Sequence, residues 1–283
     1  MPTARDFLSL VVFAHTVFAL PFALLSAVLA ANGVPEGRTL LWILVAMVGA
    51  RSAAMSFNRI VDRHIDAKNP RTARREIPAG VVSPAAAARF CVGSAVLLLV
   101  AAAQLNRLCL FLSPVALAVV LGYSYAKRFT PLAHLFLGLA LAIAPVGSWI
   151  AVTGAFALPP VLLGLAVLFW VAGFDVLYSL QDEEFDRAHG LRSIPARFGA
   201  PKALQIARLF HGATLVLLYA VFLAVDGGWL FGAAVVVAGG FLIRQHRLVS
   251  PGDLSRVDAA FFTANGWLSV AVFVLGAADV LLR

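Results

Sequence analysis

Residues 58–66 read Asn-Arg-Ile-Val-Asp-Arg-His-Ile-Asp, which places oxygen-bearing side chains at every fourth position, Asn58, Asp62 and Asp66. On an α-helix, this spacing stacks the three side chains on one face, about 6 Å apart along the axis. The stretch closes a long apolar run, where an unpaired carboxylate is expensive. The pattern therefore predicts that a positively charged group compensates these oxygens.

A second acidic stretch of the same form follows later in the chain. Tyr178, Asp182 and Asp186 repeat the four-residue spacing at the end of another apolar run, and Asp175 lies three residues before Tyr178. We expect these four residues to line one helical face. Two acidic helix ends in one hydrophobic chain predict two half-sites that hold a metal-bound polyphosphate between them. The alternative for each stretch is a charged span end whose acids pair with neighbouring arginines.

The composition is typical of a polytopic membrane protein. Of the 283 residues, 61% are hydrophobic and 13% are charged, whereas soluble domains have about 25% charged residues. The apolar residues fall into blocks of about 20, which is the length that crosses a bilayer as a helix. We expect an all-α protein with nine transmembrane helices around a central cavity, in a single domain over residues 1–283. The expected spans are residues 7–31, 39–62, 84–104, 108–125, 131–152, 158–180, 202–225, 228–246 and 259–281.

Basic residues are concentrated in alternate loops, those after the second, fourth, sixth and eighth expected spans. Because cytoplasmic loops are enriched in Lys and Arg, these loops and the N-terminus are predicted to be cytoplasmic. Both acidic stretches then end at the same face. We expect an integral protein of a bacterial inner membrane, with its active site toward the cytoplasm. The net charge of +8 is explained by topology and by membrane lipid headgroups, so no nucleic-acid partner is expected.

The residue types around the two acidic stretches suit a magnesium diphosphate. Mg²⁺ prefers oxygen ligands, keeps several waters and is typically bound by one or two carboxylates plus substrate phosphate. Lysine and arginine suit the phosphate oxygens, and arginine can engage two at once. The predicted catalytic residues and metal ligands are Asn58, Asp62, Asp66, Asp182 and Asp186. The predicted substrate-binding residues are Arg51, Lys68, Arg71, Arg75, Tyr123, Lys127, Asp175, Tyr178, Arg192 and Ser193.

Two of these substrate contacts have open alternatives. Arg51 lies seven residues before Asn58 and so about two turns deeper on the same face. It is predicted either to bind a carboxylate or phenolate of a second substrate or to pair within the membrane with Asp175 or a helix-end carbonyl. Tyr123 and Lys127 are four residues apart, and they are predicted either to reach phosphate or to extend toward the membrane surface.

Isolated histidines and cysteines are predicted to be packing or interfacial residues. The histidines are His15, His134 and His211, and the cysteines are Cys91 and Cys109.

At these residues the chain resembles the UbiA superfamily of intramembrane aromatic prenyltransferases, which also has nine spans. Three family motifs recur, Asn-x-x-x-Asp-x-x-x-Asp, Tyr-x-x-x-Lys and Asp-x-x-x-Asp. They match Asn58, Asp62 and Asp66, then Tyr123 and Lys127, then Asp182 and Asp186.

Within the superfamily, the sequence around the first motif is similar to the 4-hydroxybenzoate polyprenyltransferase branch. It is similar also to the prenyltransferases assigned to menaquinone synthesis by the futalosine route. The matching elements are residues 62–66, 71–72 and 77–80. The chain lacks the Met-x-Arg-Thr element of haem O synthases. It also has Arg75-Glu76 where Arg-Pro is common in the family, a departure that bears on the acceptor.

The resemblance implies a polyprenyl diphosphate donor and an aromatic acid acceptor in quinone biosynthesis. Mg²⁺ ions bridged by the aspartates neutralise the diphosphate, and an allylic cation is captured by a ring carbon of a 4-hydroxybenzoate-like acid. Arg51 stands where this branch has an arginine for the acceptor carboxylate. A dihydroxynaphthoate acceptor in menaquinone biosynthesis is the alternative. A membrane transporter is a distant one, because the two acidic stretches end at one membrane face rather than at the midplane.

Overall fold

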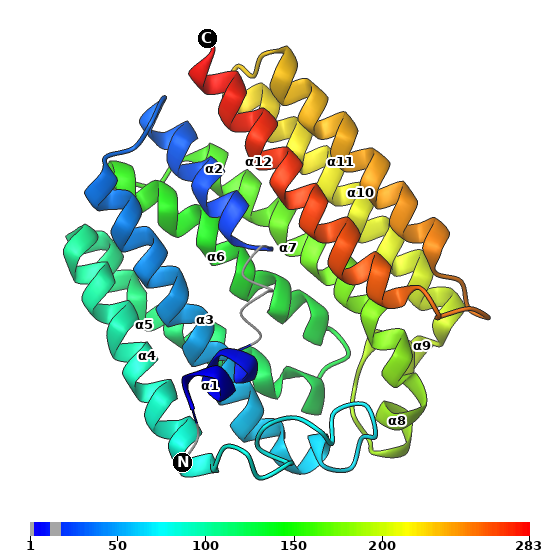
Figure 1. The fold of residues 1–283 in the computed structure, drawn as a ribbon. Coiled ribbons are helices and arrows are strands. Elements are labelled where there is room, and N and C mark those ends of the chain that lie inside the picture. The colour runs from blue at the N-terminus through cyan, green and yellow to red at the C-terminus, as the bar shows by residue number, and fades with distance from the viewer. Residues whose placement is uncertain (1–2, 12–17) are drawn as a thin grey trace. The chain divides into compact units, whose positions relative to one another are not determined.

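The computed structural model describes residues 3–11 and 18–283, and every regular element in them is a helix (Figure 1). Their packing divides the chain into two compact units. One unit consists of Met1–Thr16 and Arg38–Tyr125, and the other of Val17–Gly37 and Ala126–Arg283. The first unit contains α1 (Ala4–Leu10), α3 (Gly37–Asp66, from its second residue), α4 (Pro84–Leu105) and α5 (Arg107–Gly122). The second contains α2 (Leu20–Ala31), α6 (Ala133–Thr153), α7 (Leu158–Ser179), α8 (Glu183–Ala188), α9 (Ile194–Phe198), α10 (Ala200–Ala224), α11 (Trp229–Leu248) and α12 (Asn265–Leu281).

The all-α membrane fold is confirmed. Eight helical segments of the described residues are long and apolar enough to cross a membrane, and they coincide with eight of the nine expected spans. The first expected span, 7–31, contains two helices instead, α1 and α2, and residues 12–17 lie outside the described residues. The 12 residues of α2 extend about 18 Å, which is shorter than the hydrocarbon thickness.

In the first unit, α1 packs against the loop that follows α3. Leu10 and Val11 share an apolar cluster with Ile77 and Val82 of that loop. The Ser9 hydroxyl donates a hydrogen bond to Glu76 Oε1 at 2.5 Å. The loop that carries the predicted basic residues is therefore anchored by apolar burial as well as by its own turns.

The second unit is organised around α7, whose Trp170 is completely buried. The long helices α10, α11 and α12 run side by side within this unit (Figure 1). Unpaired polar groups are costly in an apolar interior, and here three polar side chains bond to each other, although Gln245 Oε1 has no partner among the described residues. Asn265 Oδ1 accepts hydrogen bonds from Trp170 Nε1 at 2.8 Å and from Gln245 Nε2 at 2.6 Å. This polar network ties α7, α11 and α12 together.

Helices α6 and α7 are in backbone contact, and glycine makes this possible. A Cβ atom added at Gly138 would lie 2.3 Å from the carbonyl oxygen of Leu168, whereas one added at Gly147 on the same helix would meet nothing within 4 Å. We expect Gly138→Ala to destabilise the protein by about 1–3 kcal/mol, because overpacking forces the helices apart. Gly147→Ala is the matched control and should leave the melting temperature in detergent unchanged or slightly raised. Equal melting temperatures for the two variants would contradict this account of the contact.

A buried carboxylate on α12 caps the start of α11. Asp279 is 2% exposed, and its carboxylate accepts hydrogen bonds from the backbone N–H groups of Gly228 at 2.8 Å and Phe231 at 3.3 Å. Arg283 pairs with the same carboxylate at 3.0 Å. Since the first N–H groups of a helix have no partner within it, this side chain supplies one from outside.

We expect Asp279→Ala to lower the free energy of unfolding by about 1–3 kcal/mol, because buried donors lose their acceptor. Asp279→Asn keeps the shape and one oxygen acceptor and should fall between alanine and the native residue. Thermal unfolding of the three proteins in the same detergent measures this order. An alanine variant as stable as the native protein would mean that the cap contributes nothing.

Candidate metal and diphosphate site

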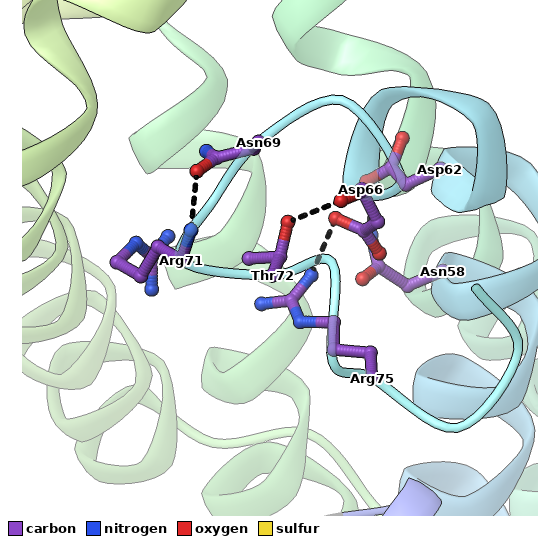
Figure 2. A network of polar contacts seen from close by, with 7 residues as sticks. All are labelled: Asn58, Asp62, Asp66, Asn69, Arg71, Thr72 and Arg75. Carbon is purple, nitrogen blue, oxygen red and sulfur yellow. Dashed lines mark hydrogen bonds and ion pairs between the residues drawn. The ribbon is translucent and has the colours of Figure 1, made fainter. Parts of the chain in front are cut away.

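The first acidic set lies at the end of α3 in the arrangement that its spacing predicted. Asp62 and Asp66 are buried, with 1% and 3% of their surface exposed. The Asn58 side-chain amide donates to Asp62 Oδ2 at 3.1 Å, which connects the first two members of the row. Figure 2 shows Asn58, Asp62 and Asp66 together at this helix end.

The loop after α3 folds back onto Asp66 through a series of turns (Figure 2). The Thr72 hydroxyl donates to the carbonyl oxygen of Asp66 at 3.1 Å, and Asn69 Oδ1 accepts from the backbone N–H of Arg71 at 2.9 Å. Near its end, Gly80 has φ +75°, a conformation in which side chains other than glycine are strained. The loop therefore has a defined path over the end of the helix.

Arg75 forms an ion pair with the last acid of the set. Its guanidinium lies 2.7 Å from Asp66 Oδ1, and Figure 2 shows this side chain turned back toward the helix. The other oxygen, Asp66 Oδ2, is buried and has no hydrogen-bond partner among the described residues. A buried carboxylate oxygen without a donor is free to accept a cation.

The other predicted basic residues of this half lie apart from Asp66. Lys68 is exposed, and the side chain of Arg71 points away from the aspartates in Figure 2. Arg51 lies on α3, is half-buried, and is close enough to Tyr123 to interact with it electrostatically. The structure therefore places Arg51 and Tyr123 near each other.

Sequence reasoning missed Arg59, which directly follows Asn58. Arg59 is 6% exposed, and the charges of Asp66, Glu76 and Arg75 lie near it. Its Nε is buried with no hydrogen-bond partner in the described part of the chain. The signal was present, because a charged residue inside an apolar span is itself unusual.

The second acidic set does not lie on one uninterrupted α-helix, so that prediction was wrong in detail. α7 ends at Ser179 and is followed by a 3₁₀ turn, η3 (Leu180–Asp182), before α8 begins at Glu183. A 3₁₀ helix has three residues per turn instead of 3.6, so Asp182 and Asp186 are rotated relative to the α-helical prediction. Glu183, which was not included in the site, forms an ion pair with Arg187 at 2.7 Å.

Side chains of the second unit gather around this set. The Ser193 side chain hydrogen bonds to Asp186, which also lies close to the charges of Asp182 and Lys127. Asp175 Oδ2 lies 2.6 Å from Nδ1 of His134.

Two predicted substrate residues have partners within the unit. The Tyr178 ring packs on that of Phe261, with centroids 4.2 Å apart. The Arg192 guanidinium donates to the carbonyl oxygen of Phe129 at 2.8 Å. The backbone N–H of Arg192 donates to the carbonyl oxygen of Lys127 at 2.7 Å.

The pair Tyr123 and Lys127 lies in a 3₁₀ helix, η2 (Tyr123–Arg128). In this geometry residues four apart do not stack on one face, because the period is three. The two side chains therefore point in different directions around this element, and their predicted contact with phosphate stays a prediction. The boundary between the two compact units falls inside this element, after Tyr125.

The oxygen ligands fit a hard cation that keeps part of its own coordination shell. Among the described residues, no group of three or more His, Cys, Asp or Glu side chains is arranged to hold a metal ion by itself. The first set provides two carboxylates and an amide, one buried carboxylate oxygen lacking a donor. Mg²⁺ is suited to such a set, because it commonly takes only one or two carboxylates and completes its octahedron with water and substrate phosphate.

Comparison with known proteins gives one consistent result. The UbiA prenyltransferase family matches residues 19–268. A 4-hydroxybenzoate octaprenyltransferase of Nitrosomonas europaea is 31% identical over 259 residues, covering 90% of this chain and 87% of that protein. One from Francisella tularensis subsp. tularensis is 26% identical, covering 92% and 89% of the two chains.

Solved structures share the fold. The apo structure of a UbiA homologue from Aeropyrum pernix K1 has a TM-score of 0.81 and 34% identity, covering 94% of this chain and 96% of that one. A UbiA homologue from Archaeoglobus fulgidus bound to DMAPP and Mg²⁺ has a TM-score of 0.76, covering 97% and 99%, and at 19% identity it supports the fold alone. The acidic sets, the helical architecture and the extent of these matches agree, and the chain belongs to the UbiA prenyltransferase family, in its 4-hydroxybenzoate polyprenyltransferase branch.

Proposed function

We propose that this chain transfers a polyprenyl group from polyprenyl diphosphate to a ring carbon of 4-hydroxybenzoate or a similar aromatic acid, with Mg²⁺ as cofactor. Prenyl transfer to an aromatic is the activity of the relatives that match most of the chain. The observation that carries the magnesium diphosphate is the end of α3, where buried carboxylates lie beside an arginine-rich loop. Carboxylates that can bind a metal, next to basic side chains that can bind phosphate, indicate a metal diphosphate site more specifically than either group does alone.

Residues of both acidic sets are proposed to hold Mg²⁺. These are Asn58, Asp62, Asp66, Asp182 and Asp186. When bound, the ion supplies Lewis-acid stabilisation of the charge on the departing diphosphate. Lys68, Arg71 and Arg75 of the first loop, with Lys127 and Arg192 of the second unit, are proposed to bind the diphosphate oxygens.

Arg75 is proposed to have two partners in turn. Without substrate its guanidinium pairs with Asp66 at 2.7 Å, and its side chain is 27% exposed. A cation at Asp66 would compete for the same carboxylate. Arg75 would then be available to a diphosphate oxygen, because its partly exposed side chain has room to turn.

The test is metal-dependent incorporation of a labelled prenyl group into an aromatic acid by membranes that contain the protein. Radiolabelled polyprenyl diphosphate is supplied with 4-hydroxybenzoate and Mg²⁺, and EDTA should abolish the labelled product. Dihydroxynaphthoate in a parallel reaction tests the alternative acceptor. Absence of product with either aromatic, from membranes that contain folded protein, would refute the proposal.

The site is proposed to face the cytoplasm of a bacterial inner membrane, because the loops after both acidic sets are rich in arginine. Ala79→Cys and Ala188→Cys, both at exposed positions, are introduced into a chain whose two native cysteines have been replaced. An impermeant thiol reagent should label both only after the cytoplasmic side is opened. Labelling from opposite sides would exclude one site that uses both acidic sets.

A further inference from the structure

His134 contacts two other segments of the second unit through its two ring nitrogens. Nδ1 lies 2.6 Å from Oδ2 of Asp175, near the end of α7. Nε2 accepts a hydrogen bond of 3.3 Å from the backbone N–H of Ile194, the first residue of α9. The histidine itself lies in the first turn of α6 and is 3% exposed. Its predicted role as a packing residue does not account for this pair of contacts.

The two contacts identify the tautomer of the ring. The N–H of Ile194 can only be donated to a nitrogen that carries no proton, so Nε2 is the acceptor. A neutral imidazole then carries its proton on Nδ1 and donates it to Asp175. The imidazolium form would turn two N–H groups toward each other at Ile194. The ring is therefore a neutral donor to an ionised carboxylate, and the short distance of 2.6 Å agrees with a charge-assisted hydrogen bond.

The packing of α6 on α7 leaves the ring little freedom to move. Gly138, one turn after His134, is where the backbones of the two helices touch, at Leu168. A second close approach brings Gly164 of α7 against Ala142 of α6. Because both contacts involve backbone atoms, the position of His134 relative to Asp175 is set by the helix pair and not by a flexible side chain.

The second contact reaches the acidic set itself. Ile194 directly follows Ser193, which is 4% exposed and hydrogen bonds to Asp186. The Ser193 hydroxyl also caps α9 by accepting from the backbone N–H of Ala196 at 3.3 Å. Displacing the histidine would therefore release Asp175. It would also release the Ser193–Ile194 corner, whose serine orients Asp186.

We propose that His134 is a positioning residue for the second acidic set. Its neutral ring, protonated on Nδ1, holds the Asp175 carboxylate in one orientation and holds the Ser193–Ile194 corner whose serine orients Asp186. The inference rests on the proposed function for its catalytic consequence. Groups that orient ligands in this way typically contribute 10- to 100-fold to metal affinity or activity.

Three substitutions separate the two contacts. The amide nitrogen of His134→Asn occupies the place of Nδ1 and keeps a donor to Asp175. The amide oxygen of His134→Gln reaches the place of Nε2 and keeps an acceptor for Ile194. His134→Ala loses both. His189→Ala is the control, because His189 is an exposed histidine of the same unit whose ring stacks on Phe185.

We expect His134→Ala to lower kcat by about 10- to 100-fold. Its melting temperature should also fall, because the buried Ile194 N–H loses its acceptor, and Asn and Gln should each recover part of both losses. Asp175→Asn combined with His134→Ala should cost less than the sum of the two, because the residues act as one unit. Mg²⁺-induced thermal stabilisation should shift to higher Mg²⁺ concentration in His134→Ala and should not shift in the control.

Nitrogen-15 NMR of histidine-labelled native protein in detergent gives a readout that needs no activity. The expected spectrum has a neutral, Nδ1-protonated histidine signal that is missing in His134→Ala and present in His189→Ala, because Nδ1 of His189 also carries a proton, donated to the carbonyl oxygen of Phe185. An Nε2-protonated or doubly protonated ring at this position would overturn the proposal, even if His134→Ala fails to fold. Native kcat and native Mg²⁺ response in a folded His134→Ala would overturn it too. If the native protein prenylates no aromatic acid, the proposed function fails, while the spectrum and the Mg²⁺ titration still test His134.

Discussion

Asp62→Ala, Asp66→Ala, Asp182→Ala and Asp186→Ala are each expected to reduce turnover by at least about 10³-fold. Metal stabilisation of a leaving phosphate supplies several kcal/mol, and every 1.36 kcal/mol corresponds to a factor of 10. The reaction is measured with labelled prenyl diphosphate at saturating aromatic acid and Mg²⁺. Mg²⁺-induced thermal stabilisation of the same variants should weaken in parallel.

The aspartate variants are expected to remain folded. Asp66 pairs with Arg75, whose side chain is 27% exposed, so loss of the acid leaves a cation that can turn to water. Removing one partner of a fully buried ion pair is costly, so the partial exposure of Arg75 is what limits the cost here. Melting temperatures close to the native value would separate loss of catalysis from loss of fold.

Two glutamates provide matched controls for the second set. Glu184 is exposed, and Glu183 forms an exposed ion pair with Arg187, which contributes at most about 0.5 kcal/mol. Alanine at either position should change turnover less than about threefold, since neither glutamate is a proposed metal ligand and an exposed ion pair contributes little. Essential glutamates together with dispensable aspartates would show that the assignment of the metal ligands is wrong.

Arg51→Ala is expected to raise the KM for the aromatic acid by about 10- to 150-fold, with a much smaller change for the prenyl diphosphate. Loss of one charge-assisted contact costs about 1.5–3 kcal/mol, and an interaction made equally in ground and transition states appears in KM. Arg51 lies seven residues before Asn58, so it is about 10 Å deeper along α3. This depth argues against a diphosphate at the aspartates as its main partner.

Arg51→Lys should restore little, because a point charge replaces a planar donor that can engage both carboxylate oxygens. Arg38→Ala is the control on the same helix, since Arg38 is exposed and bonds to Gln104 at 3.4 Å. Should Arg51→Ala weaken the donor and leave the acceptor unchanged, Arg51 belongs to the diphosphate or to the fold. A competition assay with 4-hydroxybenzoate and dihydroxynaphthoate then identifies the acceptor, because both carry a carboxylate and Arg51 cannot distinguish them.

Much of the fold could be predicted because the bilayer imposes a simple rule. A helix must satisfy its own backbone and must be about 20 apolar residues long to cross, and eight expected spans agree with the structure to within a few residues, apart from α7, whose helical segment continues to Ala188. The first span was harder to predict, because composition does not distinguish one continuous helix from the separate helices α1 and α2.

The acidic row of α3 was predictable for the same reason, because a regular α-helix converts spacing into a face. That conversion failed at η3, where the helix tightens to a period of three, and η2 tightens in the same way. Whether a helix end tightens depends on the hydrogen bonds of its terminal backbone groups. The spacing of side chains in the sequence does not predict those bonds.

The sequence by itself determined the helical membrane architecture, the family and the chemistry of the candidate ligands, because length, composition and local spacing suffice for these. Tertiary structure alone decided which distant residues meet: Arg75 with Asp66, His134 with Asp175 and Ile194, and Asp279 with the start of α11. Those contacts depend on where backbones can approach, as at Gly138 against Leu168. The sequence does not distinguish a histidine that packs against lipid from one that orients a carboxylate, because only its neighbours in space differ.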